Sequence, residues 1–226
     1  WYDGAIRYLD CRVGELVDFL DDRGELDDTV VVITADHGEL FGEHGLEKHN
    51  YSLAEQLLHV PLVIKPAGDQ RSGETVESMV SLLDLFPTLI EAAGGTPPGR
   101  PFAETLYDLA DRPRHEHVFA ELDGMEDAVP KQRYPDLDDS ELGQPRQSVR
   151  NDQYKLVRRI DGTTSLYDWR ADPEESTDLT DERSDVVKAL TDVLEREVGD
   201  ITQNAIEDEE ITDERLRDQL EDLGYL

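Results

Sequence analysis

Four residues near the start of the chain have side chains that suit the binding of a cation and of an anionic group. Asp36 and His37 are adjacent and precede Gly38, so a turn there lets a carboxylate oxygen and an imidazole nitrogen face one cavity. Both groups are common ligands of divalent cations. The pair predicts a metal site; the alternative is an aspartate that caps the next helix beside an exposed histidine.

Lys48 and His49 form the second pair, twelve residues beyond Asp36 in a glycine-containing loop. An ammonium group there can contact an anion, and an imidazole can give a proton or a hydrogen bond to a leaving oxygen. The alternative is an ordinary surface loop. His44, between the two pairs, is predicted to order the loop by hydrogen bonding rather than to bind metal.

The surrounding pattern predicts an α/β sheet that positions these residues. Apolar residues in 2–23 recur with helical spacing. The β-branched run at 29–34 is typical of a strand buried on both faces. Asp36 and His37 follow this strand, at the edge where such sheets place their chemistry. Further elements are predicted as a short helix at 52–58, a strand at 59–65, and a helix at 81–90 that Gly94-Gly95 closes.

The character of the sequence changes after residue 112. Short antiparallel strands are predicted at 118–121, 147–150, 154–159 and 164–167, with an Asp161-Gly162 turn between the last two, and helices at 181–198 and 211–223. The acidic segment 122–146 is expected to be a mobile loop. We therefore predict the catalytic α/β part at 1–111 and a smaller antiparallel subdomain at 112–226.

The charge balance excludes several classes of partner. The chain has 226 residues with 54 acidic and 22 basic side chains, a net charge of −32. Such a surface does not suit a phosphate backbone or an anionic lipid. No apolar run is long enough for a membrane segment, and the single Cys11 forms no internal disulfide. Dispersed acids with scarce lysine indicate adaptation to high salt.

The order of several short motifs along almost the whole chain resembles that of the sulfatase family. The resemblance is weakest over 112–146. The motifs are, in order, Thr34-Ala35-Asp36-His37-Gly38-Glu39, Gly42-Glu43-His44-Gly45-Leu46, Lys48-His49, Val60-Pro61-Leu62, Asp84-Leu85-Phe86-Pro87-Thr88, Tyr154-Lys155-Leu156, Leu166-Tyr167-Asp168 and Asp172-Pro173-Glu174.

The resemblance implies an alkaline-phosphatase-like sheet flanked by helices, with a small C-terminal antiparallel α+β subdomain. It implies a sulfuric ester hydrolase that acts on small-molecule or glycan sulfate esters. Asp36 and His37 match the pair of metal ligands, most often for calcium, although a histidine ligand suits manganese or zinc at least as well. Lys48 matches the lysine that contacts the sulfate oxygens, and His49 is placed near the leaving group.

One part of the family pattern is missing from these residues. Sulfatases use a Cys or Ser in a Cys/Ser-x-Pro-x-Arg motif as the nucleophile, and Cys11 is followed by Arg12-Val13-Gly14-Glu15 on a predicted helix. We therefore expect a C-terminal fragment that holds about half an active site and is inactive alone.

Three alternatives remain open at this stage. They are a phosphodiesterase or phosphonate monoester hydrolase of the same superfamily, a phospho-transferase of this fold, and a truncated non-catalytic paralogue. The single cysteine and the lack of a targeting segment favour the cytoplasm.

Overall fold

The computed structural model describes residues 1–68, 73–97, 115–123 and 144–199, with positions 99, 103, 105 and 106. The predicted helix at 211–223, most of the acidic segment 122–146 and the proposed boundary at 111/112 lie outside these residues. The mixture of helices and sheets agrees with the expected α/β class.

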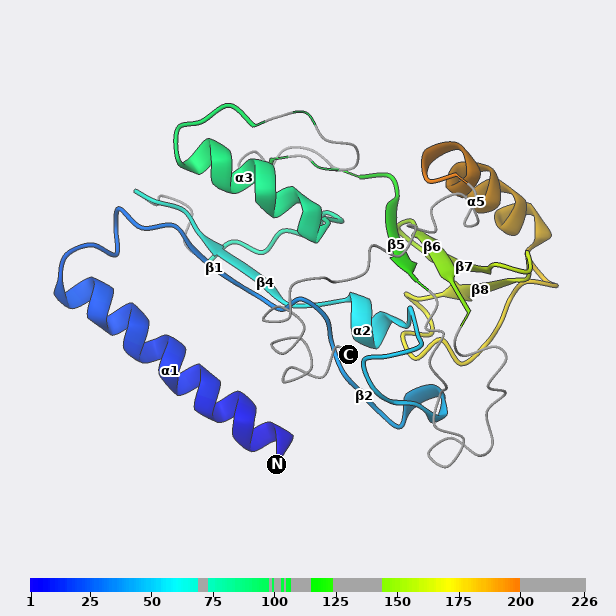
Figure 1. Ribbon diagram of the computed structural model, residues 1–226, viewed down its shortest axis with the longest axis horizontal. Coiled ribbons are helices and arrows are strands. Elements are labelled where there is room, and N and C mark those ends of the chain that lie inside the picture. The colour runs from blue at the N-terminus through cyan, green and yellow to red at the C-terminus, as the bar shows by residue number, and fades with distance from the viewer. Residues whose placement is uncertain are drawn as a thin grey trace, which may run out of the picture.

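The N-terminal part consists of a helix, a pair of strands and a second helix (Figure 1). Helix α1 (Tyr2–Asp22) is followed by β1 (Val31–Thr34), which pairs antiparallel with β4 (Leu62–Lys65). Helix α3 (Leu85–Ala92) continues from the 3-10 turn η2 (Leu82–Asp84). Figure 1 shows α1 and α3 on opposite sides of the β1–β4 pair. This part therefore combines two helices with a two-stranded antiparallel sheet, which agrees with the predicted mixture of helices and strands.

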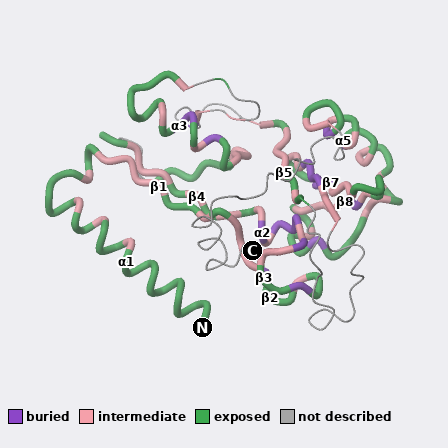
Figure 2. Tube along the Cα trace, viewed as in Figure 1, coloured by how far each residue is buried: buried purple, intermediate pink, exposed green. Residues whose placement is uncertain are grey.

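The prediction that the first strand is buried on both faces is wrong. Ile33 of β1 is 40% exposed and Val63 of β4 is 57% exposed. Helix α1 contains no buried residue, and Figure 2 shows most of it as exposed. Within the described residues, β4 is the one strand that pairs with β1. The β-branched residues do form a strand, but Val31 and Val32 are only half-buried and Ile33 is exposed.

A folded loop connects β1 to β4. It contains β2 (Leu40–Phe41), the 3-10 turn η1 (Glu43–Gly45), β3 (Glu47–Lys48) and the single-turn helix α2 (Glu55–Leu58). This helix is shorter than the predicted 52–58. Five side chains form a small core of its own beneath the loop: Leu40, Leu46, Tyr51, Ala54 and Leu57. The loop is therefore an ordered unit, and we call it the site loop (residues 36–58).

The C-terminal part is a four-stranded antiparallel sheet with its strands in chain order. The strands are β5 (Val118–Leu122), β6 (Arg146–Arg150), β7 (Tyr154–Arg159) and β8 (Thr164–Asp168). Helix α5 (Ser184–Glu197) packs on one face through Leu190 and Leu194, against Val149, Leu156 and Leu166. The predicted strands are confirmed to within one residue at each end. Gly162 has φ of 84° in the turn, as the Asp161-Gly162 pair predicts.

The predicted helix at 81–90 is confirmed with its two end signals. Ser81 and Asp84 form a capping box at its start. Gly94 adopts φ of 75°, and the Gly95 amide donates to the Ile90 carbonyl, which closes the helix. Among the helices of the described residues, none combines the length and apolar character needed to cross a membrane.

Candidate active site

Asp36 and His37 follow β1 and lie at the start of the site loop. The His37 amide donates to Asp36 Oδ1 over 3.0 Å, and the His37 Nε2 atom lies 3.8 Å from Asp36 Oδ2. Two donor atoms that share one cation at about 2.0–2.6 Å lie roughly 3–4 Å apart. The separation of these two atoms therefore fits a shared divalent cation.

The second nitrogen of His37 determines which atom is free to bind metal. His37 Nδ1 lies 2.9 Å from the carbonyl oxygen of Gly38. Because a carbonyl only accepts hydrogen bonds, Nδ1 carries the proton and the neutral ring keeps its lone pair on Nε2. Metal-binding histidines are commonly oriented by such a bond from the other ring nitrogen. The lone pair is thus on the atom that faces Asp36.

Gly38 fixes the distance between this turn and α2. Its amide donates to the Leu57 carbonyl over 2.8 Å. A Cβ atom at position 38 would lie 1.9 Å from the carbonyl oxygen of Gln56, well inside van der Waals contact. Only glycine permits this close approach. The turn that contains Asp36 and His37 therefore packs directly against the backbone of α2.

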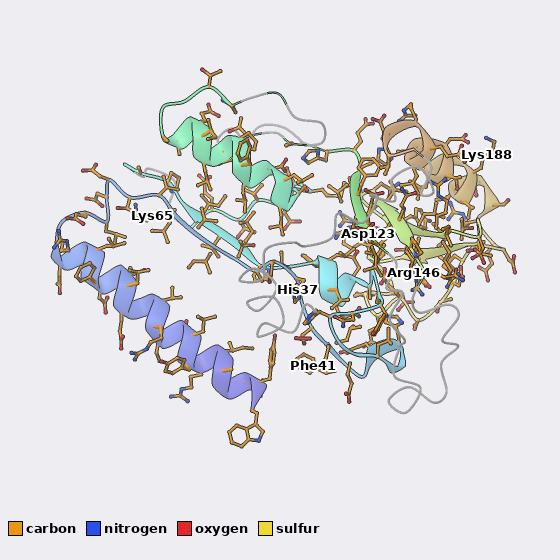
Figure 3. All side chains as sticks on the ribbon, viewed as in Figure 1. His37, Phe41, Lys65, Asp123, Arg146 and Lys188 are labelled. Carbon is orange, nitrogen blue, oxygen red and sulfur yellow. The ribbon has the colours of Figure 1, made fainter. Side chains whose placement is uncertain are left out.

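His49 lies against His37 and is held by a carboxylate. The two rings are 4.2 Å apart between centroids, with planes tilted by 32°. His49 Nδ1 is 3.1 Å from Glu39 Oε1. A carboxylate beside Nδ1 orients an imidazole ring. The pair leaves Nε2 of His49 for a further partner, and Figure 3 shows the labelled His37 beside α2.

Lys48 and His44 occupy the turns of the site loop. Lys48 is exposed, has φ of 70° and pairs across β2 with Leu40. Its ammonium forms no ion pair with any described residue. His44 has φ of 55° and is exposed. The prediction that its side chain orders the loop by hydrogen bonding finds no partner among the described residues; the loop is instead turned by its backbone.

Glu43 closes the tip of the loop. The Phe41 amide donates to Glu43 Oε2 over 2.5 Å. This backbone hydrogen bond lowers the pKa of the Glu43 carboxyl from its ordinary value, so the side chain accepts this bond as a carboxylate at neutral pH. Glu43 therefore supports the turn by accepting this backbone hydrogen bond.

Asp36 and His37 are the two candidate metal ligands that the described residues bring together. They contain no group of three or more His, Cys, Asp or Glu side chains placed to hold one ion. The donor types and their spacing fit a cation at Asp36 and His37, but the coordination sphere is incomplete within this part of the chain. Cys11 is exposed on α1, as expected for a helix residue.

Sequence reasoning did not identify four charged residues, one in the site loop and three in the C-terminal part: Glu55, Arg150, Lys155 and Glu175. They form ion pairs that join α2 to the C-terminal sheet. Burial lowers the pKa of the Arg150 guanidinium, while the carboxylates of Glu55 and Glu175 oppose this effect. One signal was present in the sequence: Lys155 is one of only five lysines and stands near the start of a predicted strand, between Tyr154 and Leu156.

The described fold is that of known sulfatases. A solved structure in complex with its substrate D-glucosamine-2-N,6-O-disulfate aligns with 91% of this chain and 41% of its own, at a TM-score of 0.68 and 22% identity. The phosphonate monoester hydrolase of Agrobacterium radiobacter aligns with 84% of this chain and 38% of its own, at a TM-score of 0.67 and 25% identity. These neighbours define an alkaline-phosphatase-like α/β class.

Sequence comparison leads to the family. The sulfatase family model matches residues 1–95. Arylsulfatase K of Bos taurus is 29% identical over 197 residues, which cover 86% of this chain and 35% of that protein. A multifunctional alkaline phosphatase superfamily protein of Trinickia caryophylli is 31% identical over 187 residues, covering 79% and 35%. Residues 1–95 thus match the sulfatase family, and the chain spans about a third of the length of these relatives.

Proposed function

We propose that this chain supplies part of the active site of a hydrolase that cleaves sulfate esters with the help of a divalent cation. The observation that carries the proposal is the orientation of His37. Its Nδ1 atom is held by the Gly38 carbonyl, and its Nε2 atom lies 3.8 Å from Asp36 Oδ2, a spacing suited to one shared cation.

The residues of the site loop have distinct roles in this proposal. Asp36 and His37 hold the cation, which when bound neutralises charge on the ester oxygens. Lys48 extends its ammonium toward the sulfate group, where a point charge stabilises the negative oxygens. His49, oriented by Glu39 at 3.1 Å, gives a proton to the leaving oxygen.

The nature of the cation follows from the donor atoms. Calcium prefers oxygen ligands, and a nitrogen ligand suits manganese or zinc better. The resemblance favours calcium, whereas the His37 imidazole favours the other two. Titration of the 226-residue chain with each ion by calorimetry distinguishes them.

The remaining parts of the site are proposed to lie in polypeptide that these residues do not contain. The nucleophile motif does not occur in the sequence, and among the described residues no group of three or more potential metal ligands surrounds one point. The chain spans 35% of the length of its relatives. On this proposal the 226 residues bind the cation weakly and do not turn over alone. A non-catalytic paralogue is the alternative, and it predicts no hydrolysis by the full protein either.

The proposal is tested by a sulfate ester hydrolysis assay on the full protein that the gene encodes. Asp36→Ala and Lys48→Ala are each expected to lower kcat/KM by at least about 100-fold, because each removes a charge that faces the reacting group. His44→Ala is the matched control in the same loop and is expected to retain most of the activity. Full activity in both Asp36→Ala and Lys48→Ala would overturn the proposal.

A phosphonate monoester hydrolase is the second candidate. It is favoured by the likeness to the Agrobacterium radiobacter enzyme and to the Trinickia caryophylli protein of the same superfamily. The same cation and lysine suit a phosphonate ester, because its oxygens carry similar charge. The ratio of kcat/KM for an aryl sulfate to that for a phenyl phosphonate monoester decides between the two.

The substrate class and the surroundings of the protein are further proposals. Because one structural neighbour binds D-glucosamine-2-N,6-O-disulfate and another is described as a 2-O glycosaminoglycan sulfatase, we propose a glycan sulfate ester as substrate. Cytoplasmic location and adaptation to high salt also remain predictions from the sequence.

A further inference from the structure

A cluster of four charges, three of them buried and the fourth, Arg150, half-buried, joins α2 to the C-terminal part. Lys155 is 1% exposed, and its ammonium lies 3.3 Å from Glu55 Oε1 and 2.5 Å from Glu175 Oε1. The contact with Glu175 is an ion pair without hydrogen-bond geometry. Arg150 donates to Glu55 Oε2 over 2.6 Å and stacks on Trp169. With two charges of each sign, we call this set the neutral ion cluster.

The neutral ion cluster holds the backbone at the start of α2 as well as its side chains. Lys155 donates to the Leu53 carbonyl over 2.7 Å, and the Glu55 amide donates to Glu175 Oε2 over 3.0 Å. The partners are about a hundred residues apart in the sequence. The segment 53–55 is therefore fixed from the C-terminal sheet, and not only by its own loop.

The opposite end of the same short helix touches the candidate site. The Leu57 carbonyl accepts the Gly38 amide, and Gln56 leaves no room for a side chain at position 38. A movement at the start of α2 therefore reaches the carbonyl of Leu57 within one turn. Gly38 in turn accepts the bond that orients His37.

Residues with strained backbone conformations occur in the site loop and in the neutral ion cluster. Within the described residues, four non-glycine residues have positive φ: His44, Lys48 and Tyr51 in the site loop, and Glu175 in the neutral ion cluster. Such conformations are disfavoured and persist where the surrounding contacts hold them. The site loop thus depends on external support, and the cluster is the buried polar contact that provides it.

We propose that Lys155 is a positioning residue for the Asp36–His37 site, acting through Glu55, α2 and Gly38. An effect of Lys155 on catalysis rests on the proposed function. The coupling between Lys155 and His37 rests only on the contacts that join Lys155 to α2 and α2 to Gly38. Lys155 itself is buried and does not touch the site residues. The alternative is a purely stabilising role, in which its loss lowers stability but leaves the folded site unchanged.

The experiment measures the two site histidines directly in the metal-free 226-residue chain. Imidazole proton resonances report ring stacking, and the 4.2 Å separation of the His37 and His49 rings makes their shifts sensitive to small movements. Lys155→Met removes the charge and the bond to Leu53. We expect both histidine resonances to move and the Gly38 amide to exchange about tenfold faster relative to the amides of β7.

Lys188→Met is the matched control, because Lys188 is an exposed lysine on α5 that pairs with Asp192. Figure 3 shows it at the far side of the molecule from His37. We expect no change in either readout. A folded Lys155→Met chain with unmoved His37 and His49 resonances would overturn the proposal.

A second variant keeps the test decisive if Lys155→Met does not fold. Lys155→Met/Glu175→Gln removes one charge of each sign and keeps the cluster neutral, so no buried charge is left uncompensated. It still lacks the bond to Leu53, and we expect the same resonance shifts. Unmoved resonances in this variant contradict the coupling. Because neither metal nor ester is present, failure of the hydrolysis assay leaves this result unaffected.

Discussion

The N-terminal layer of α1, β1 and β4 and the C-terminal sheet with α5 differ in how they use their apolar residues. In the C-terminal part, Val149, Leu156, Leu166 and Leu194 are all 0% exposed. In α1, Leu9 is 63% exposed and no residue is buried. Both parts have the spacing of apolar residues that is typical of helices or strands, but only the C-terminal part buries them. The spacing therefore predicts which face of an element is apolar, but it does not predict which element packs against that face.

The site loop lies between these two parts and is joined to them unequally. Tyr2 of α1 meets Phe41 of β2 edge to face, with ring centroids 4.7 Å apart. The C-terminal sheet contacts the loop through the buried charges of Glu55, Lys155 and Glu175. The stability of the loop is therefore expected to follow that of the C-terminal sheet more closely than that of α1.

The largest expected effect is a cavity in the C-terminal core. Leu156→Ala is expected to lower the free energy of unfolding by about 2–5 kcal/mol, because its neighbours relax only partly around the lost methyl groups. Leu9→Ala in α1 is expected to change it by less than about 0.5 kcal/mol. Urea unfolding followed by the fluorescence of Trp169 measures both. Equal losses would show that α1 is as well packed as the sheet.

The next effect concerns the contact between the site turn and α2. Gly38→Ala places a Cβ atom 1.9 Å from the Gln56 carbonyl oxygen, and we expect a loss of about 1–3 kcal/mol with weaker cation binding. Gly14→Ala is the matched control in α1, where nothing lies within 4 Å and alanine improves helix propensity by about 1 kcal/mol. Thermal unfolding and metal titration measure the two outcomes. Unchanged cation binding in Gly38→Ala would show that the Asp36–His37 turn does not depend on its contact with α2.

A smaller effect is expected from salt. The net charge of −32 repels itself at low ionic strength, and the Debye length falls from about 10 Å at 0.1 M salt to about 3 Å at 1 M. We expect the unfolding midpoint to rise by several degrees as KCl increases over this range. The neutral ion cluster is mostly buried and is therefore screened little by salt. Because this cluster holds α2 in place, we expect the His37 and His49 resonances to change little. A falling midpoint would argue against adaptation to high salt.

The smallest effect is the acid sensitivity of the C-terminal sheet. Burial raises the pKa of Asp178, but hydrogen bonds from Thr180 and from the Leu166 amide outweigh it and hold the pKa below its ordinary value of 3.8. A lowered carboxyl pKa stabilises the fold above pH 3.8, and this contribution is lost as the pH falls through the folded value.

Asp178→Asn does not titrate, so it is expected to reduce the loss of stability below pH 3.8. Asp181→Asn changes an exposed neighbour and serves as the reference. Urea unfolding at pH 6 and pH 3, followed by Trp169 fluorescence, compares them. An identical pH dependence in Asp178→Asn and the unaltered chain would rule out this role of Asp178.

Local signals were sufficient for much of the fold. The capping box of Ser81 and Asp84, the closing pair Gly94-Gly95 and the Asp161-Gly162 turn all occur where the sequence predicts them. These features depend on residues within about one turn of each other, so the sequence contains the necessary information. The burial of β1 was predicted wrongly because burial depends on elements that its own sequence does not specify.

The candidate site also has features that the sequence predicts and features that depend on the fold. Asp36, His37, Lys48 and His49 were recognised by type and order, and the structure brings His37 and His49 into ring contact. The Glu39–His49 pair and the close approach of Gly38 to Gln56 depend on how the loop folds over its own core. Residue types name the candidate ligands, but distances between side chains require the folded loop.

The sequence by itself determined the family pattern, most of the helices and strands, and the residue types that we propose for binding a cation and an anionic ester. Only the tertiary structure decided that Nε2 of His37 faces Asp36 and that Lys155 supports α2 from a strand a hundred residues away. The physical reason is the distance along the sequence over which each interaction acts. Propensity and turn chemistry act over a few residues, whereas buried ion pairs and backbone contacts form when packing brings distant segments together.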